Sequence, residues 1–576
     1  MAIVNLNGIQ VAEGPAPEVN GTTAADTLLV FGELEGGSVT GDRASDTITL
    51  DTLDGDAFGF TFNGNDGPDS IEIDNDAIFS AVSFVGDADL FGGKGEDTIR
   101  VRNVEIVEGL NIQGNDGDDS IFVRLDDNGF VNGPATDITG LSVNGNDGFD
   151  DIFIGGTELV NLRDSSFNGG KGDDSITINA DDIRGISVNG DNGNDTIYVD
   201  ANATNSGNIQ DSAILGGEGD DSIFVGNNLS TVEDNLFQGN AGDDSIYITG
   251  GEDLFKRNEV FGGKGDDSIY INNQTDITES FVNGNIGEDF IEIDGDIDQS
   301  TVAGGKDDDF IELTSLVQNS IIAGDLGDDG IQFVGSAELE GSDVLGGDGD
   351  DLIFGGTYQP NAGELTDLTF ETVGSADSDT LLDGGDGDDT IAIDGETAGD
   401  ATILGGAGAD TFQLWNGGSA EFTDFESGVD TLIIGDYVTT QDGSFRAGKQ
   451  IEFFEALPDG QGTANIVTIA GGNVGTTLLA PNGVNLGVTQ APLFNGADIN
   501  TRLDSILRAA TNTATAVNTI SEKILFLDTA GTDAGLYIYT AEATYVNSNL
   551  TPQNANILNT QEIALGVFAA SDITVI

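Results

Sequence analysis

The chain has 576 residues, of which 103 are acidic and 17 are basic, and its formal net charge is −86 at pH 7. This charge excludes a nucleic-acid binder, which needs a basic surface, and argues against peripheral binding to anionic lipid. The absence of histidine and cysteine removes histidine-based acid–base catalysis, the Ser-His-Asp triad, most zinc sites and disulfides. No apolar run is long enough to span a membrane.

Residues 1–20 contain Pro15 and Pro17 and are predicted to form an N-terminal lead-in or cap. They lack a basic segment followed by an apolar core, so we expect no Sec-type signal peptide. Two imperfect copies of a glycine-rich phrase follow, at residues 21–28 and 41–48. End copies of a repeat array are commonly atypical because they cap an open end, so we expect weak or absent ion binding in these two.

From Gly64 to about Phe412 the phrase recurs roughly every 20–30 residues, and residues 261–271 (FGGKGDDSIYI) show it most clearly. Numbered from its first glycine, position 1 is Gly in roughly fifteen good copies and position 2 is only Gly, Asn or Asp. Position 4 is Gly except where Asp307 stands, and position 8 is apolar, usually Ile. Gly, Asn and Asp adopt left-handed backbone at low cost, so the phrase predicts a tight turn followed by a strand. A fixed period of this length predicts a solenoid.

Position 6 is Asp in every good copy, which surface solubility alone does not require. These residues are Asp69, Asp97, Asp119, Asp150, Asp174, Asp195, Asp221, Asp244, Asp267, Asp289, Asp309, Asp329, Asp351, Asp389 and Asp410. Ca²⁺ takes six to eight oxygens from carboxylates and backbone carbonyls together, and one turn offers too few. We therefore expect stacked turns to share about 14–16 Ca²⁺ ions, with the position-6 aspartates as side-chain ligands.

The alternative is a disordered, low-complexity chain rich in Gly and Asp. Alternating runs such as Ser120–Val123 and Ser245–Ile248 are too regular for that interpretation when Ca²⁺ is present. Without Ca²⁺ we expect disorder, because unneutralised carboxylates repel one another across every coil.

The motif G-G-x-G-x-D-x-(large apolar)-x resembles the RTX, or haemolysin-type, calcium-binding nonapeptide, and the resemblance covers about two-thirds of the chain. It implies a right-handed parallel β-roll or β-solenoid with Ca²⁺ in the glycine-rich turns. It also implies that carbonyls of the turn glycines complete the sites; the position-1 glycines proposed as ligands are Gly92, Gly114, Gly169, Gly216, Gly239, Gly262, Gly346, Gly384 and Gly405. RTX proteins typically leave the cell by type I secretion, directed by an uncleaved C-terminal signal.

One departure from the RTX pattern is that the motif here alternates with a variable segment instead of repeating in direct tandem. Examples of the variable segment are 179–185 (NADDIRG), 294–299 (DGDIDQ) and 314–319 (TSLVQN). We therefore expect ions mainly along one edge of the solenoid and irregular loops along the other.

After Phe412 glycine and aspartate become sparse, and we expect a C-terminal, mainly-β domain. Residues 420–435 resemble the segment that closes RTX arrays. Short strands are expected at 450–454, 465–470 and 476–480, and a hairpin at 524–528 and 535–539. Within 498–520, Ile499, Leu503, Ile506 and Leu507 space like one face of a helix. The predicted organisation is all-β: an N-terminal lead-in at 1–20, a calcium-binding β-solenoid at 21–412, and a capping, secretion or assembly domain with one helix at 413–576.

These observations favour a structural, non-enzymatic protein of the cell surface, such as an S-layer subunit or surface fibril. Repeats begin near residue 21 and fill the chain to its closing domain, leaving little room for a separate catalytic domain. In architecture the chain resembles RTX-containing S-layer proteins and the oscillin-type surface fibrils. We expect self-association, contact with cell-surface polysaccharide, passage through type I secretion machinery and an extracellular location, with neither nucleic acid nor a membrane span involved.

Two alternatives remain open at this point. The first is an adhesin that grips matrix polysaccharide, for which Trp415, Tyr358 and Tyr437 are candidate sugar-stacking residues, although packing is the favoured interpretation of each. The second is a polysaccharide lyase or epimerase on a parallel β-solenoid. Acidic pairs are so frequent here that none marks a unique catalytic site.

Overall fold

The computed structural model describes most of residues 2–434, with its longest gaps at 75–83, 126–135 and 356–379; beyond residue 434 it describes only strands β51 to β58. The described residues are all-β, contain no helix, and form a parallel β-solenoid, which confirms the predicted fold class. This part of the chain therefore offers no helix that could cross a membrane. The chain divides into two compact units, residues 1–302 and 303–576, and each is described by itself.

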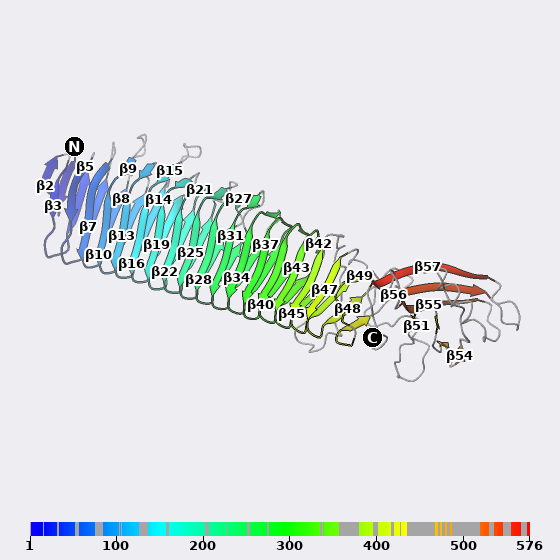
Figure 1. Ribbon diagram of the computed structural model, residues 1–576. Coiled ribbons are helices and arrows are strands. Elements are labelled where there is room, and N and C mark those ends of the chain that lie inside the picture. The colour runs from blue at the N-terminus through cyan, green and yellow to red at the C-terminus, as the bar shows by residue number, and fades with distance from the viewer. Residues whose placement is uncertain are drawn as a thin grey trace. The chain divides into compact units, whose positions relative to one another are not determined.

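Each complete coil contributes strands to three faces, and within each unit most strands pair in parallel with the matching strand of the next coil (Figure 1). In the coil built on residues 166–186, β19 (Ser166–Lys171) lies on face 1 and leads into the glycine-rich turn. β20 (Ser175–Asn179) follows the turn on face 2, and the short β21 (Asp182–Arg184) lies on face 3. Faces 1 and 3 belong to one continuous sheet and face 2 to another.

Face 1 consists of β3 (Glu18–Asn20), β5 (Leu34–Thr40), β7 (Ala57–Asp66), β10 (Asp89–Lys94), β13 (Asn111–Asp116), β16 (Ser142–Asp147), β19, β22 (Ser187–Asn192), β25 (Ala213–Glu218), β28 (Leu236–Ala241), β31 (Glu259–Lys264), β34 (Phe281–Ile286), β37 (Thr301–Lys306), β40 (Ile321–Leu326), β43 (Asp343–Asp348), β45 (Leu381–Asp386), β47 (Thr402–Ala407) and β49 (Ala420–Phe422). Face 2 consists of β4 (Thr27–Phe31), β6 (Thr47–Asp51), β8 (Ser70–Asp74), β11 (Thr98–Arg102), β14 (Ser120–Leu125), β17 (Asp151–Gly156), β20, β23 (Thr196–Asp200), β26 (Ser222–Val225), β29 (Ser245–Ile248), β32 (Ser268–Asn272), β35 (Phe290–Asp294), β38 (Phe310–Leu313), β41 (Gly330–Phe333), β44 (Leu352–Gly355), β46 (Thr390–Asp394), β48 (Thr411–Trp415) and β50 (Thr431–Ile434). Face 3 consists of β9 (Phe84–Gly86), β12 (Ile106–Glu108), β15 (Thr136–Thr139), β18 (Val160–Arg163), β21, β24 (Gly207–Gln210), β27 (Leu229–Glu233), β30 (Leu254–Lys256), β33 (Ile277–Thr278), β36 (Ile297–Asp298), β39 (Val317–Gln318) and β42 (Leu339–Glu340).

The variable segments are more regular than the expected irregular loops. Residues 179–185 contain β21, residues 294–299 contain β36, and residues 314–319 contain β39. These strands are short because only one side chain of each, such as Ile183, is needed inside the coil, where it is fully buried. The expectation of loops without strands was therefore wrong for these three segments.

The interior of each coil is filled by alternate apolar side chains from all three faces. In the coil of β19 to β21, Phe167, Ile176, Ile178 and Ile183 have no exposed surface. The alternation follows from the two-residue period of a strand, which turns every second side chain inward. Burying one such side chain contributes about 1.5–3 kcal/mol. Because each coil contacts only the coils beside it, this contribution depends on stacking between neighbours.

The N-terminal lead-in forms an antiparallel hairpin of β1 (Ala2–Leu6) and β2 (Ile9–Gly14). β1 also pairs antiparallel with β4 of face 2, where all later neighbours run parallel. This hairpin covers the first open strand edge of face 2, as a terminal cap must, because exposed edges invite pairing with other chains.

Coil pairing in the second unit extends beyond Phe412. β49 pairs in parallel with β47, and β50 pairs in parallel with β48. Further along, β57 (Asn554–Leu565) pairs with β49, and β58 (Ile573–Val575) pairs with β50.

The remaining strands of the C-terminal part are mainly antiparallel. The predicted hairpin is confirmed as β55 (Thr519–Asp528) and β56 (Gly535–Thr544). The others are β51 (Val467–Ala470), β52 (Asn473–Val474), β53 (Leu478–Ala480) and β54 (Val484–Leu486). β51 and β53 fall within two of the predicted strand segments, whereas residues 450–454 lie outside the described residues. The predicted helix also lies outside them, except for its last two residues, which begin β55.

Candidate metal centre

The glycine-rich turn connects face 1 to face 2, and its backbone is left-handed where the sequence predicts it. At position 2, φ is 76° to 86° where the residue is Asn or Asp and 94° to 134° where it is Gly. Most position-4 residues are left-handed too, including Asp307, whose φ is 75°. The restriction to Gly, Asn and Asp therefore has a conformational cause.

The position-6 aspartates form a buried column behind these turns, and each is at most 5% exposed. The backbone N–H of Asp244 donates to Oδ1 of Asp267 at 2.7 Å, and the N–H of Asp267 donates to Oδ1 of Asp289 at 2.8 Å. The same hydrogen bond links every successive pair from Asp26 to Asp289 in the first unit. In the second unit it runs from Asp309 to Asp430. One oxygen of each carboxylate thus satisfies the backbone of the preceding coil.

The second carboxylate oxygen, Oδ2, explains why position 1 is always glycine in the good copies. A Cβ on Gly262 would stand 2.5 Å from Oδ2 of Asp267 and 2.7 Å from the carbonyl oxygen of Gly284 in the next coil. A Cβ on Gly92 would meet Asp97 Oδ2 and the Gly114 carbonyl at the same two distances. Position 1 has no left-handed backbone to require glycine, so the space is what excludes a side chain. A carboxylate oxygen and a carbonyl oxygen therefore converge at most of these turns.

Many of these Oδ2 atoms have no hydrogen-bond partner among the described residues. They belong to Asp69, Asp97, Asp119, Asp150, Asp174, Asp195, Asp221, Asp244, Asp267, Asp329, Asp351 and Asp389. An unpaired buried carboxylate oxygen facing a carbonyl oxygen is unfavourable, because neither atom can donate a hydrogen bond. Such a position needs a cation or a proton between the two oxygens.

The pKa values of the column reflect this environment. Burial raises the pKa of thirteen of these carboxyls, the N–H donor on Oδ1 lowers it in part, and neighbouring carboxylates raise it again. The pKa rises to about 6 for Asp69, Asp150, Asp195, Asp329 and Asp410, to about 7 for Asp97, Asp221, Asp244 and Asp389, and to about 8 for Asp119, Asp174, Asp267 and Asp351.

The two ends of the column differ from its middle. The N–H of Thr22 donates to Asp26 Oδ2, and the N–H of Asp42 donates to Asp46 Oδ2 at 2.8 Å. Burial would raise the pKa of Asp26, but the Thr22 and Asn7 hydrogen bonds outweigh it, and the pKa is lowered. Thr22 and Asp42 occupy position 2 without a positive φ, so their N–H groups turn inward. A backbone donor thus takes the place at Oδ2 that a cation could hold.

Asp430 closes the column at the other end, and the sequence analysis did not identify it. Its Oδ1 accepts the N–H of Asp410 at 3.1 Å, and its Oδ2 accepts the N–H of Glu426 at 2.6 Å. The signal was hidden because Phe425 stands at position 1 of that turn, where every good copy has glycine. The TDFESGVD segment could have been found from the position-4 glycine, Gly428, and the position-6 acid alone.

The corner between face 3 and face 1 provides an internal comparison, because it carries neutral side chains in the same role. Asn258 Oδ1 accepts the N–H of Asn235, and Asn258 Nδ2 donates to the carbonyl of Val232 at 2.8 Å. Elsewhere in this corner a serine hydroxyl accepts the N–H, as Ser280 does from Asn258 and Ser300 does from Ser280. Asn and Ser side chains can therefore join coils in this corner without a buried charge. Asparagine at position 6 could accept the backbone N–H with its oxygen and donate to the carbonyl with its nitrogen. The column nevertheless has aspartate there, so the second carboxylate oxygen requires an explanation other than joining coils.

A cation at each turn would be held by Oδ2 of a position-6 aspartate and the position-1 carbonyl of the following coil. Calcium accepts mixed sets of carboxylate and backbone carbonyl oxygens, whereas zinc prefers nitrogen and sulfur. The described residues contain no group of three acidic side chains that could hold a metal by side chains alone. Backbone carbonyls are thus a necessary part of any site at these turns.

The residues predicted as ligands lie beside these turns, and their role in holding metal stays a prediction. All fifteen position-6 aspartates line the column. The carbonyl oxygens of Gly92, Gly114, Gly169, Gly216, Gly239, Gly346, Gly384 and Gly405 face the position-1 glycine of the preceding coil. Gly262 contributes the close approach to Asp267 described above. Tyr358 and Tyr437, proposed for sugar stacking, lie outside the described residues, and Trp415 ends β48.

A second row of acids was missed, at position 5, on the solvent side of the turn. The N–H of Asp243 donates to Oδ1 of Asp220 at 3.0 Å, and the N–H of Asp266 donates to Oδ1 of Asp243 at 2.9 Å. These bonds run in the opposite sense along the chain to those of the buried column. Unlike the column aspartates, these residues are exposed, which explains why Pro, Glu, Phe, Asn and Ala also occur at position 5.

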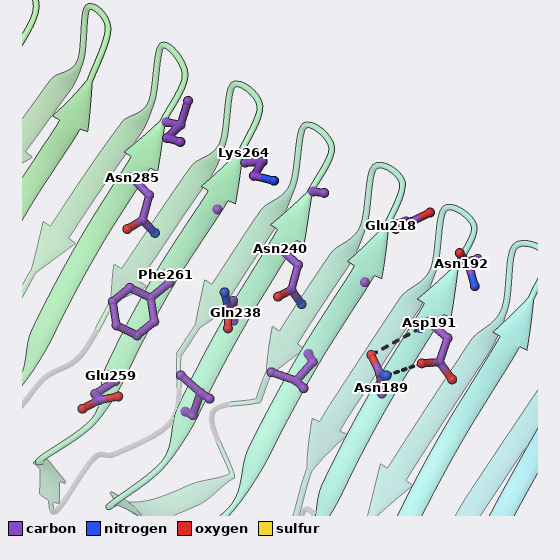
Figure 2. A pocket seen from close by; sticks show the side chains of 16 residues that line it. Asn189, Asp191, Asn192, Glu218, Gln238, Asn240, Glu259, Phe261, Lys264 and Asn285 are labelled. Atoms are coloured by element: carbon purple, nitrogen blue, oxygen red, sulfur yellow. Dashed lines mark hydrogen bonds between the residues drawn. The ribbon is translucent and has the colours of Figure 1, made fainter.

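On face 1 the outward side chains beside the turns line a shallow groove of about 860 Å³ across β22, β25, β28, β31 and β34 (Figure 2). Asn189 and Asp191 hydrogen-bond each other there, and Gln238, Asn240, Lys264 and Asn285 point outward from neighbouring strands. This polar surface is separate from the buried column.

Comparison with known proteins adds no relative: no family model, curated protein or solved structure matches the chain.

Proposed function

We propose that this chain is a calcium-dependent structural protein of the cell surface, an S-layer subunit or surface fibril that self-assembles outside the cell. One observation carries the proposal: a column of buried carboxylate oxygens that face carbonyl oxygens at successive turns and have no hydrogen-bond donor among the described residues. Metal would neutralise each oxygen pair and join one coil to the next.

Calcium fits this donor set better than a proton does under neutral conditions. A proton would satisfy one aspartate at a time, whereas pKa values of about 6 to 8 leave many of the carboxyls ionised at pH 7 to 8. Ca²⁺ sites of extracellular modules have dissociation constants of about 10⁻⁴–10⁻³ M, so they fill outside the cell and empty when Ca²⁺ is withdrawn. A net charge of −86 also creates a general demand for divalent counter-ions.

The extracellular and assembly parts of the proposal rest on the RTX-like motif and on the share of the chain that coils occupy. Parallel coils that contact only their neighbours form extended surfaces, which suit repetitive assemblies. Under this proposal the C-terminal strands serve secretion through type I machinery or contact with cell-surface polysaccharide.

The test uses the purified full chain, dialysed first against EGTA and then against 5 mM CaCl₂ or 5 mM MgCl₂. We expect about 12–16 Ca²⁺ per chain by atomic emission, a β-type circular-dichroism spectrum only with Ca²⁺, and ordered assemblies by electron microscopy. Magnesium is the matched control because it demands octahedral geometry and retains its waters. A fully folded chain in EGTA that binds no Ca²⁺ at millimolar concentration contradicts the metal part; bound Ca²⁺ without assemblies contradicts only the surface-structure part.

A further inference from the structure

Face 2 of the first unit carries an aromatic column on its solvent side. Position 9 of successive copies points outward there, and adjacent members are direct register partners in neighbouring strands. In order, the column is Arg100, Phe122, Phe153, Thr177, Tyr198, Phe224, Tyr247, Tyr270 and Glu292. The sequence analysis did not single it out, because its members are 21–31 residues apart and differ in type.

The rings of this column stack on one another. Phe122 and Phe153 have centroids 4.9 Å apart with planes 19° apart, and Tyr198 and Phe224 are 4.9 Å and 6° apart. Tyr247 and Tyr270 are 4.4 Å and 18° apart. Because the ring faces cover each other, solvent meets their edges; Tyr198 remains 36% exposed and Tyr247 42%. Sugar rings pack on aromatic faces, so this geometry favours a protein surface over a glycan.

Opposite charges bound the aromatic part of this row, which continues past Arg100 to its register partner Glu72 in β8. Arg100 is exposed at one end and Glu292 is half-buried at the other, and neither forms an ion pair with another described residue. The neighbouring Arg102 is instead paired with Glu72 at 2.5 Å and with Asp74 at 3.0 Å. Arg100 and Glu292 lie the same number of strands from Tyr198, which occupies the middle of the column.

We propose that a second copy of this chain docks face to face on the aromatic column, with the two columns antiparallel about a two-fold axis at Tyr198. This symmetry places Arg100 of each copy opposite Glu292 of the other, at both ends of the interface. It also places Phe224 opposite Thr177, the one small member of the column. A parallel arrangement would place Arg100 on Arg100 and Glu292 on Glu292, so charge selects the antiparallel one.

The size of the surface is sufficient for such a dimer. Eight strand spacings make a strip about 38 Å long, and five residues of strand make it about 16 Å wide. Each copy would bury on the order of 600 Å², and the pair about 1,200 Å², which is the lower bound for a stable, specific interface. Stacked rings in the centre and charges at the rim match the usual anatomy of such interfaces.

The inference deepens the proposed self-assembly by naming its interface, and charge reversal tests it on the full chain in Ca²⁺. Arg100→Glu puts two glutamates together at both ends, so we expect the dimer dissociation constant, measured by sedimentation, to rise on the order of tenfold or more. Arg100→Glu combined with Glu292→Arg restores both pairs and should restore the wild-type value. Arg184→Glu on face 3 makes the same charge change away from the column and should leave association unchanged.

Cross-linking tests the register independently of affinity, because the chain has no native cysteine. On the row beside the column, Thr196 lies level with Tyr198, Ser120 with Phe122 and Ser268 with Tyr270. The two-fold places Ser120 opposite Ser268 of the other copy. With a short bis-maleimide we expect Thr196→Cys to cross-link to itself. Ser120→Cys and Ser268→Cys should cross-link when mixed but not alone.

Each outcome bears on one proposal or the other. A wild-type chain that stays monomeric in Ca²⁺ at 100 µM, an unrescued double variant, or cross-linking of Ser120→Cys to itself overturns the antiparallel interface. If Arg100→Glu loses the dimer but still binds Ca²⁺ and folds, the interface is supported and the metal sites are unaffected. If ordered assemblies form normally from Arg100→Glu, this interface is wrong while the proposed function stands.

Discussion

Replacing Asp267 by asparagine separates a structural role from a metal-binding role, because the two roles predict opposite signs with and without calcium. Asparagine keeps an Oδ1 that can accept the Asp244 N–H, which the wild-type carboxylate accepts at 2.7 Å. Its amide nitrogen replaces Oδ2, which lies close to the Gly284 carbonyl. Asn258 shows in the opposite corner that such an amide can donate to a carbonyl of a neighbouring coil.

The size of the stability change without Ca²⁺ follows from the pKa of Asp267. Burial, opposed in part by the Asp244 N–H, raises the pKa of Asp267 from 3.8 to about 8. In EGTA at pH 7 the folded chain must therefore take up a proton that the unfolded chain lacks, which costs at most about 4 kcal/mol. Asp267→Asn removes this cost, so we expect the coils around it to become more stable without Ca²⁺, by on the order of 2–4 kcal/mol.

With saturating Ca²⁺ the sign should reverse, since the variant lacks a charged ligand. Native mass spectrometry should show at least one ion fewer, and hydrogen exchange should quicken in peptides from residues 240–290 while distant coils stay protected. Two controls bracket the effect: Asp266→Asn, on the exposed row, should change little, and Asn258→Asp should destabilise in both conditions. The reasoning is refuted if Asp267→Asn has the same sign with and without Ca²⁺.

Three further predictions concern the same column. In EGTA the column carboxyls have pKa values of about 6 to 8 in the folded chain and 3.8 in the unfolded chain, so the folded chain binds more protons and its thermal midpoint should fall as pH rises from 5 to 8. With Ca²⁺, protons compete with the metal, and the midpoint should instead rise over the same pH range. If the dependence of the midpoint on pH is the same with and without Ca²⁺, metal does not bind at these carboxyls. Gly262→Ala should cost about 2–4 kcal/mol by urea unfolding in Ca²⁺, because its Cβ would meet Asp267 Oδ2 and the Gly284 carbonyl. Asn240→Gly, at a position 2 where other copies carry Gly, adds no atom and should cost less than about 1 kcal/mol. Equal effects of the two substitutions would argue against a steric cause. Asp46→Asn should destabilise the first coils by roughly 1–2 kcal/mol with or without Ca²⁺, because the Asp42 N–H would then face an amide donor. The number of bound Ca²⁺ ions should stay unchanged. Loss of an ion in this variant would mean that the end copies also bind metal.

The turn and its aspartate could be predicted from the sequence because both depend on local chemistry. Position 2 of each copy carries a residue that tolerates positive φ, and an invariant acid at a fixed offset from it suggested a cation ligand. The features that could not be predicted from the sequence depend on contacts between residues 20–38 positions apart, such as the hydrogen bond from the Asp351 N–H to Asp389 Oδ1. The neutral Ser and Asn corner and the aromatic column were missed for this reason: their members share a place in the coil, but no constant sequence marks that place.

The hydrogen bond from Asp351 to Asp389 is 2.8 Å long across 38 residues, the same length as the bond from Asp309 to Asp329 across 20. Coil length can therefore nearly double without shifting the buried column. For evolution, this means that additional sequence between Gly355 and Thr380 is compatible with an intact hydrogen bond in the buried column. For engineering, it marks a place where a foreign module could be displayed at a defined position on an otherwise regular scaffold.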